Sequence, residues 1–201
     1  IRQQEPMPKS PSFIVYTGPM CSSKTSKLLS ALERYKYQHK KVAVFKPVLD
    51  DRYSTTAVVS HAGWSIPSLT VKTGADILES LASMDSEPDV VAVDEAFMLP
   101  GIAEVLVFLY RKGVDVLVST LDISSTGKPF AEIKTMLIWA THIEKCTAIC
   151  TICGDDARYT HKKIVDENSE EIQVGGLDVY EPRCFKHHVA IDLREVESIE
   201  K

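Results

Sequence analysis

Residues 18–25 carry the most informative chemistry in the chain, because they separate an apolar run from a helix-like pattern. The apolar run 13–16 predicts a buried strand, and the leucines at positions 28, 29 and 32 predict the buried face of a helix. A loop that enters a helix N-terminus presents backbone N–H groups to an anion, and the helix dipole strengthens the attraction. The sequence therefore predicts a loop that binds the phosphates of a nucleoside triphosphate, formed by Gly18, Pro19, Met20, Cys21, Ser22, Ser23, Lys24 and Thr25.

Two side chains at the end of this loop have specific predicted tasks. Lys24 would reach the β- and γ-phosphates, and Thr25 would offer its hydroxyl to Mg²⁺. Ser23 stands where loops of this kind usually carry glycine, so the alternative is a plain loop that closes onto a capped helix.

A carboxylate pair follows a second apolar run. Residues 90–93 are all apolar and predict a buried strand, which ends at Asp94 and Glu95. In phosphate-loop enzymes an acidic residue at such a strand end orients Mg²⁺, the role predicted for Asp94. Glu95 would accept a proton from the hydroxyl of a phosphoryl acceptor. The alternative is that the pair merely caps the next segment.

The cysteines indicate a metal site. Cys150 and Cys153 are separated by two residues, and thirty residues later Cys184 and His187 repeat that spacing. Two such pairs supply the four ligands of a closed tetrahedral zinc site, which stabilises a fold without taking part in chemistry. His188 is the rival fourth ligand, Cys146 and Cys21 fall outside the spacing, and disulfides are the less favoured alternative.

The surrounding pattern predicts the elements that position these residues. Short β-rich runs alternate with helix-periodic segments, which is typical of a parallel α/β sheet with flanking helices, as in P-loop NTPases. The predicted strands are 13–16, 42–45, 90–93, 114–119 and 143–148, and the predicted helices are 24–38, 75–83, 102–112 and 130–140. The polar segment 47–69, with a β-like run at 57–60, predicts a mobile hairpin over the site or a plain surface loop.

The pattern changes after Cys146 to cysteine pairs and short strands at 158–165 and 171–174. The sequence thus predicts a flexible arm (1–12), a nucleotide-binding α/β domain (13–145), a small zinc-ribbon-like domain (146–188) and a peripheral, weakly helical tail (189–201).

Composition limits the classes of function. The 201 residues are 44% hydrophobic and 25% charged, as in ordinary globular proteins, and the formal net charge is −5. An acidic chain without a basic stripe is atypical of a nucleic-acid binder, and no apolar run is long enough to cross a membrane. The polar N-terminus does not resemble a secretory signal, so we expect a cytoplasmic protein without nucleic-acid or membrane partners.

The order and spacing of these motifs resemble the type II (zinc-containing) thymidine kinases. The resemblance extends from residue 14 to residue 187. Beyond the loop, the carboxylates and the metal ligands, it includes the stretches 32–35, 46–47, 50–54, 59–61, 94–96, 121–122, 128–130 and 174–180.

The resemblance implies transfer of the γ-phosphoryl group of ATP to the 5′-hydroxyl of thymidine, and of deoxyuridine as a second acceptor, giving dTMP and ADP for DNA precursor synthesis. It also implies a homotetramer, Arg52 as a neutralising cation, Glu95 as the base, and a zinc-anchored lasso loop over the nucleoside. The implied nucleoside-binding residues are Met20, Met98, Leu121, Phe130, Thr160, Val174, Gly175, Gly176 and Tyr180.

Two positions depart from the family pattern. Ser23 replaces a glycine, and if this position needs a positive φ, serine adds about 1 kcal/mol of strain. Phe97-Met98 stands where the family typically has glutamine followed by an aromatic residue, which affects the expected contacts to the nucleoside. The competing interpretations are an ATPase whose zinc ribbon grips nucleic acid, and a regulatory nucleotide-binding subunit without catalysis.

Overall fold

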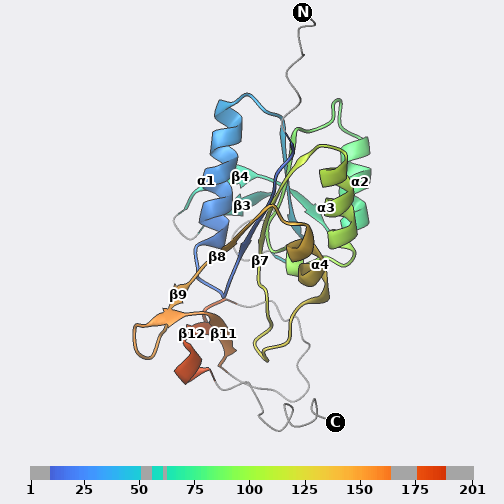
Figure 1. Cartoon of the computed structure of the whole chain (residues 1–201). Coiled ribbons are helices and arrows are strands. Elements are labelled where there is room, and N and C mark those ends of the chain that lie inside the picture. Colours follow the sequence, from blue (N-terminus) through green and yellow to red (C-terminus); the bar gives the residue numbers. More distant parts are fainter. Residues whose placement is uncertain (1–9, 51–55, 61–62, 164–175, 189–201) are drawn as a thin grey trace, which may run out of the picture.

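The structure is a computed structural model that describes residues 10–50, 56–60, 63–163 and 176–188 (Figure 1). Within these residues the centre is a six-stranded, fully parallel sheet of order β5-β2-β6-β7-β1-β8. Its strands are β1 (Phe13–Thr17), β2 (Val42–Pro47), β5 (Leu69–Val71), β6 (Val90–Val93), β7 (Asp115–Thr120) and β8 (His142–Lys145).

Helices cover both faces of this sheet. Helix α1 (Lys24–Tyr37) lies on one face, and α2 (Gly74–Ala82), α3 (Ile102–Arg111) and α4 (Ala131–Trp139) lie on the other (Figure 1). The α/β class with a parallel sheet and flanking helices is therefore as predicted, and the predicted helices differ from the observed ones by no more than one residue at either end.

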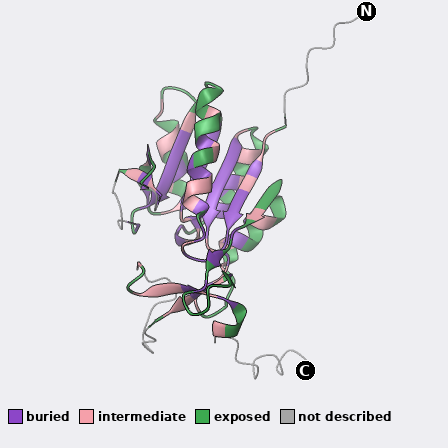
Figure 2. Ribbon diagram, turned by 90° about the vertical axis from the view of Figure 1, so that its left-hand side faces the viewer, coloured by how far each residue is buried: buried purple, intermediate pink, exposed green. Residues whose placement is uncertain are grey.

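Alternating side chains of the central strands fill two cores. Val90 and Ala92 of β6 pack on the α1 side with Leu28 and Leu32, whereas Val91 and Val93 belong to the core under α2, α3 and α4. All four residues of β6 are buried, as expected of a parallel strand covered on both faces (Figure 2). The apolar run that predicted this strand is thus explained by two-sided burial.

The segment predicted as a hairpin forms one in its described part. Strands β3 (Ala57–Val59) and β4 (Ser65–Pro67) pair in antiparallel fashion, and Val58 and Ile66 pack in the core beneath α1. The following strand β5 was not predicted, yet it pairs in parallel with β2 at the edge of the main sheet. The hairpin is therefore held against the α1 face by its apolar side chains.

The predicted strand 143–148 is wrong in its second half. Strand β8 ends at Lys145, and the N–H of the next residue, Cys146, donates the last hydrogen bond of the pairing with β1, to the carbonyl of Thr17 (2.6 Å). Ala148 then pairs with Ala157 in a separate two-stranded sheet. Residues 143–148 are thus divided between two sheets.

The chain beyond β8 builds small elements, and we call residues 146–163 and 176–188 the C-terminal unit. Its strands pair as two antiparallel sheets, β9 with β10 and β11 with β12, and a short helical turn, η2, follows (Figure 1). Its buried apolar cluster contains Ala148, Cys150, Ala157 and Cys184, too few residues for an independent core. The bounds are β9 (Ala148–Ile149), β10 (Asp156–Ala157), β11 (Tyr159–Lys162), β12 (Tyr180–Arg183) and η2 (Phe185–His187).

Several predicted features lie outside the described residues. They are most of the arm 1–12, Arg52, the strand 171–174 with Val174, Gly175, and the tail 189–201. No α-helix in the described parts of the chain combines the length and the apolar character that crossing a membrane would require.

Candidate active site and metal centre

The predicted phosphate loop lies at the carboxyl edge of the sheet, between β1 and α1. Its side chains close it from inside: the Ser22 hydroxyl and the Lys24 ammonium both donate to the carbonyl of Pro19, at 2.7 and 2.6 Å. Lys24 is buried, and burial lowers its pKa, although the carboxylates of Glu95 and Asp94 oppose the shift. The Lys24 side chain is therefore buried in the loop, and its ammonium contacts the loop's own backbone at Pro19.

The backbone of the loop adopts left-handed conformations at two residues that are not glycine. Cys21 has φ 62° and Ser23 has φ 61°, and Ser23 is the residue that precedes α1. The Ser23 side chain makes no capping hydrogen bond, so the alternative of an ordinary capped helix is not supported. Ser23, which replaces the glycine usual in such loops, is thus in a conformation that glycine would adopt without strain.

Gly18 allows a close approach between the loop and the C-terminal unit. Its φ is +143°, and a Cβ atom there would lie 2.3 Å from the carbonyl oxygen of Cys146, closer than real Cβ contacts. A side chain at this position would push the two segments apart, so glycine is required by both conformation and space.

Thr25, in the first turn of α1, and Asp94, directly after β6, lie side by side. The Thr25 hydroxyl lies 3.2 Å from each carboxylate oxygen of Asp94. Asp94 is 4% exposed, and burial, assisted by the negative charge of Glu95, raises its pKa to about 7. A hydroxyl and a carboxylate beside a phosphate loop are the oxygen ligands that Mg²⁺ uses with nucleotides.

Glu95 occupies a strained position at the strand end. Its φ is +50°, and it begins the short turn η1 (Ala96–Met98) without a side-chain cap to that turn. The alternative that the acidic pair serves as a cap is therefore not supported for Glu95. Left-handed conformations outside glycine concentrate at functional sites, where surrounding contacts maintain them.

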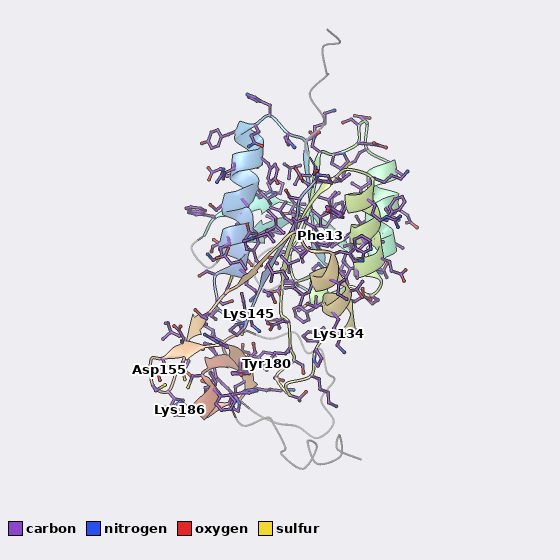
Figure 3. All side chains as sticks on the ribbon, in the orientation of Figure 1. Phe13, Lys134, Lys145, Asp155, Tyr180 and Lys186 are labelled. Carbon is purple, nitrogen blue, oxygen red and sulfur yellow. The ribbon has the colours of Figure 1, made fainter. Side chains whose placement is uncertain are left out.

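The described residues predicted for the nucleoside come from η1, β11, β12 and the segments that connect the elements. Met20 is brought together with Thr160 of β11, because the Met20 N–H donates to the Thr160 hydroxyl at 3.0 Å. The ring of Phe130 contacts that of Phe97 beside Met98, with centroids 4.9 Å apart. Leu121 follows β7, Gly176 precedes β12, and Tyr180 begins β12 in the C-terminal unit (Figure 3).

Two buried charged residues near this edge were not predicted as site residues. Lys46 is 2% exposed and its ammonium donates to the carbonyl of Asp50 at 2.8 Å. Asp122 is buried after β7 and forms an ion pair with Lys145 of β8 at 3.1 Å. The available signal was a lysine within the otherwise apolar run of β2, since lysine is almost never buried without a partner.

The four predicted metal ligands converge in the C-terminal unit. The ligand atoms of Cys150, Cys153, Cys184 and His187 all lie within 4.8 Å of one another. Adjacent pairs are closer: Cys153 and Cys184 sulfurs are 3.7 Å apart, and the His187 Nδ1 atom is 3.1 Å from the Cys184 sulfur. A tetrahedral zinc with bonds of about 2.3 Å to sulfur requires sulfur separations of about 3.8 Å. The residues therefore fit a metal ion such as zinc.

The surroundings favour metal binding over a disulfide. All five cysteines are unpaired by disulfides. Burial raises the pKa of the Cys150 thiol, but backbone N–H donors from Cys184, Ile152 and Cys153 outweigh it and bring the pKa to about 6. The backbone N–H of Asp155 lowers the pKa of Cys153, but burial and hydrogen bonds with Cys184 and Cys150 outweigh it and raise the pKa to about 11. His188 points elsewhere: its ring stacks on Tyr159 at 4.7 Å.

Together these features define a class of protein. A strand, a phosphate loop and a helix at the carboxyl edge of a parallel sheet, with a hydroxyl and a carboxylate beside them, are typical of P-loop nucleotide-binding proteins. The thymidine kinase family model matches residues 11–188. Because this match covers most of the sequence, the chain belongs to the thymidine kinase family.

Individual relatives agree with this assignment. A thymidine kinase of Thermococcus kodakarensis is 34% identical over 195 residues, covering 94% of this chain and 99% of that protein. A thymidine kinase of Deinococcus deserti is 37% identical over 190 residues, covering 87% and 93%. A thymidine kinase of Bacteroides thetaiotaomicron is 36% identical over 171 residues, covering 85% and 83%.

A solved structure was also matched. It is the genome packaging NTPase B204 from Sulfolobus turreted icosahedral virus 2 in complex with ATP-gammaS, with a TM-score of 0.44 and 15% sequence identity. The match covers 72% of this chain and 77% of that one.

Proposed function

We propose that the protein transfers the γ-phosphoryl group of ATP to the 5′-hydroxyl of thymidine, with deoxyuridine as a second acceptor. The observation that carries this proposal is the meeting of Lys24, Thr25 and Asp94 at one loop, in a chain of the thymidine kinase family. The products are dTMP and ADP, so the enzyme supplies a DNA precursor from a salvaged nucleoside.

The loop residues 18–25 would bind the triphosphate of ATP. Backbone N–H groups and the Lys24 ammonium neutralise the phosphates, while Thr25 and Asp94 would hold Mg²⁺. The Mg²⁺ ion, when bound with ATP, withdraws charge from the phosphate oxygens. Arg52 is the further cation proposed for the transferring group.

Glu95 would act as the general base. Its carboxylate accepts the proton of the 5′-hydroxyl while that oxygen forms a bond to the γ-phosphorus, and the bond to the ADP oxygen breaks. Its place at the end of β6, one residue beyond Asp94, supports this role, because the acceptor must lie beside the phosphates.

The nucleoside would bind between the sheet edge and the C-terminal unit. Met20, Met98, Leu121 and Phe130 would contribute from the sheet side. The C-terminal unit would contribute Thr160, Gly176 and Tyr180, and the lasso residues Val174 and Gly175 precede Gly176 in the sequence. A structural zinc ion held by Cys150, Cys153, Cys184 and His187 would anchor that lasso, which lowers the entropy lost on binding.

The test of this function uses Glu95→Gln. At pH 8, where Asp94 is ionised with or without the Glu95 charge, we expect turnover to dTMP to fall about 10²- to 10⁴-fold, since the base is lost, while Mg·ATP affinity changes little. Chromatographic measurement of dTMP gives the rate and calorimetry gives the affinity. Glu33→Gln, which alters an exposed carboxylate on α1, is the control and should leave both unchanged.

Two results would contradict the proposal. Unchanged turnover in Glu95→Gln would remove the base assignment. ATP hydrolysis stimulated by single-stranded DNA, with no dTMP from the wild type, would favour the ATPase instead. The homotetramer, the cytoplasmic location and the division at residues 13–145 and 146–188 stay predictions.

A further inference from the structure

The phosphate loop is joined to the C-terminal unit by a set of contacts. Cys146 donates to Thr17 and its carbonyl lies against Gly18, as described above. Met20 donates its N–H to the buried hydroxyl of Thr160 at 3.0 Å. The side chain of Cys21 packs against the buried cluster that contains Cys150 and Cys184. The loop therefore has a supporting surface outside the sheet.

The hydrogen bond to Thr160 acts on a peptide unit that also contacts Lys24. The carbonyl of Pro19 and the N–H of Met20 belong to one planar peptide, and the described chain contains no cis peptide, so the two groups point in opposite directions. The Met20 N–H is fixed by Thr160, while the Pro19 carbonyl accepts from Lys24 at 2.6 Å and from Ser22 at 2.7 Å. Rotation of this peptide would therefore displace the Lys24 ammonium.

The loop also needs such support energetically. Left-handed residues that are not glycine, here Cys21 and Ser23, are strained and persist only where neighbouring contacts enforce them. Thr160 is itself held by β11, which pairs with β12 immediately before the metal ligand Cys184. The support is thus anchored by the Cys/His cluster.

We propose that Thr160 is a positioning residue for the phosphate loop, acting through the Pro19–Met20 peptide on Lys24. Its hydroxyl holds the peptide, the peptide holds the ammonium, and the ammonium meets the β- and γ-phosphates. The inference rests on the proposed role of residues 18–25 and goes beyond a contact of Thr160 with the nucleoside, because the hydroxyl is used by the backbone of the loop.

The main test compares Thr160→Val with the wild-type protein in its metal-loaded form. Loss of a buried hydrogen-bond acceptor should weaken binding of inorganic triphosphate and of Mg·ATP about tenfold, measured by calorimetry. Amide exchange at Met20, followed by NMR, should become faster. Thr160→Ser, which keeps the hydroxyl, should remain within about twofold of the wild type.

The control variant removes the exposed hydroxyl of Thr151, which belongs to the C-terminal unit and hydrogen-bonds Glu181. Thr151 donates to Glu181 at 3.0 Å, so Thr151→Val should leave triphosphate binding and Met20 exchange unchanged. If Thr160→Val does not fold, Thr160→Ala removes the same hydroxyl without adding a methyl group. In a Lys24→Met background, removal of the Thr160 hydroxyl should cause little further loss of triphosphate affinity.

The outcomes separate the inference from the proposed function. Wild-type protein that does not bind triphosphate would overturn both. If the wild type binds triphosphate and Thr160→Val has the same affinity and the same Met20 amide exchange, only the inference about Thr160 is overturned. A higher KM for thymidine with unchanged triphosphate affinity would also overturn it, since Thr160 would then serve only the nucleoside.

Discussion

Replacement of Ser23 by glycine should stabilise the protein, because the backbone at this position is left-handed. A non-glycine residue in this conformation costs about 1–2 kcal/mol. Glycine removes that cost but adds about 0.4–1 kcal/mol of conformational freedom to the unfolded chain. The Ser23 side chain is exposed and makes no capping hydrogen bond, so its loss subtracts nothing further. Taking the middle of each range, about 1.5 less about 0.7 kcal/mol, the net gain is about 0.5–1 kcal/mol.

The assay is thermal unfolding of the metal-loaded protein without nucleotide. For a chain of this size a gain of about 0.5–1 kcal/mol corresponds to a rise in Tm of about 1–4 °C. Ser23→Ala keeps the left-handed strain and should unfold within about 1 °C of the wild type. Ser22→Gly is the opposite control, because it removes the buried hydroxyl that donates to Pro19 at 2.7 Å and should lower the Tm.

The result that refutes this reasoning is a Tm for Ser23→Gly at or below that of the wild type while Ser22→Gly is destabilised as expected. Residue 23 would then not be left-handed in solution, and the strain argued for the loop would be absent there.

Three further predictions concern the Asp94 carboxylate and the metal centre. Because burial and Glu95 raise the pKa of Asp94 to about 7, this carboxyl is protonated below pH 7 and must lose its proton to bind Mg²⁺. Mg·ATP affinity should therefore rise by up to about tenfold per pH unit as the pH increases towards 7, and Asp94→Asn should abolish that dependence in calorimetric titrations. The sign for folding is opposite: without ligand, the raised pKa makes stability decrease between the ordinary aspartate pKa of 3.8 and about 7, which thermal unfolding in that range measures. Cys153→Ser removes one of the four metal ligands, so elemental analysis should find less than one zinc ion per chain. Amide protection should then be lost in β9–β12 but kept in β6. Equal protection in both regions would contradict a C-terminal unit that the metal stabilises.

The sequence predicts those elements whose pattern is set by burial on the sheet. Residues 90–93 were predicted as a strand with the observed bounds, since two-sided burial requires an unbroken apolar run. Helix α1 was predicted at 24–38 and observed at Lys24–Tyr37, because Leu28, Leu29 and Leu32 repeat with helical spacing on its buried face. The spacing of the cysteine pairs similarly identified the four residues that converge.

Features that depend on tertiary contacts could not be predicted. Strand β8 stops at Lys145 and Ala148 already pairs with Ala157 in another sheet, and no residue type in 143–148 marks where the chain leaves the main sheet. Strand β12 contains Pro182, which disfavours a strand from sequence but is tolerated in a two-stranded sheet, on the edge of β12 whose carbonyl accepts from Thr151. The bond between Met20 and Thr160 joins residues 140 positions apart, and spacing carries no information at that range.

That separation has a consequence for the order in which the protein matures during translation. The ribosome synthesises residues 18–25 before most of the main sheet, but the hydroxyl that fixes the Pro19–Met20 peptide appears only after every strand of that sheet has been made. We therefore expect nascent chains to build their scaffold first and to gain a firm hold on nucleotide only once β11 has been synthesised, so that chains still lacking β11 do not compete for ATP.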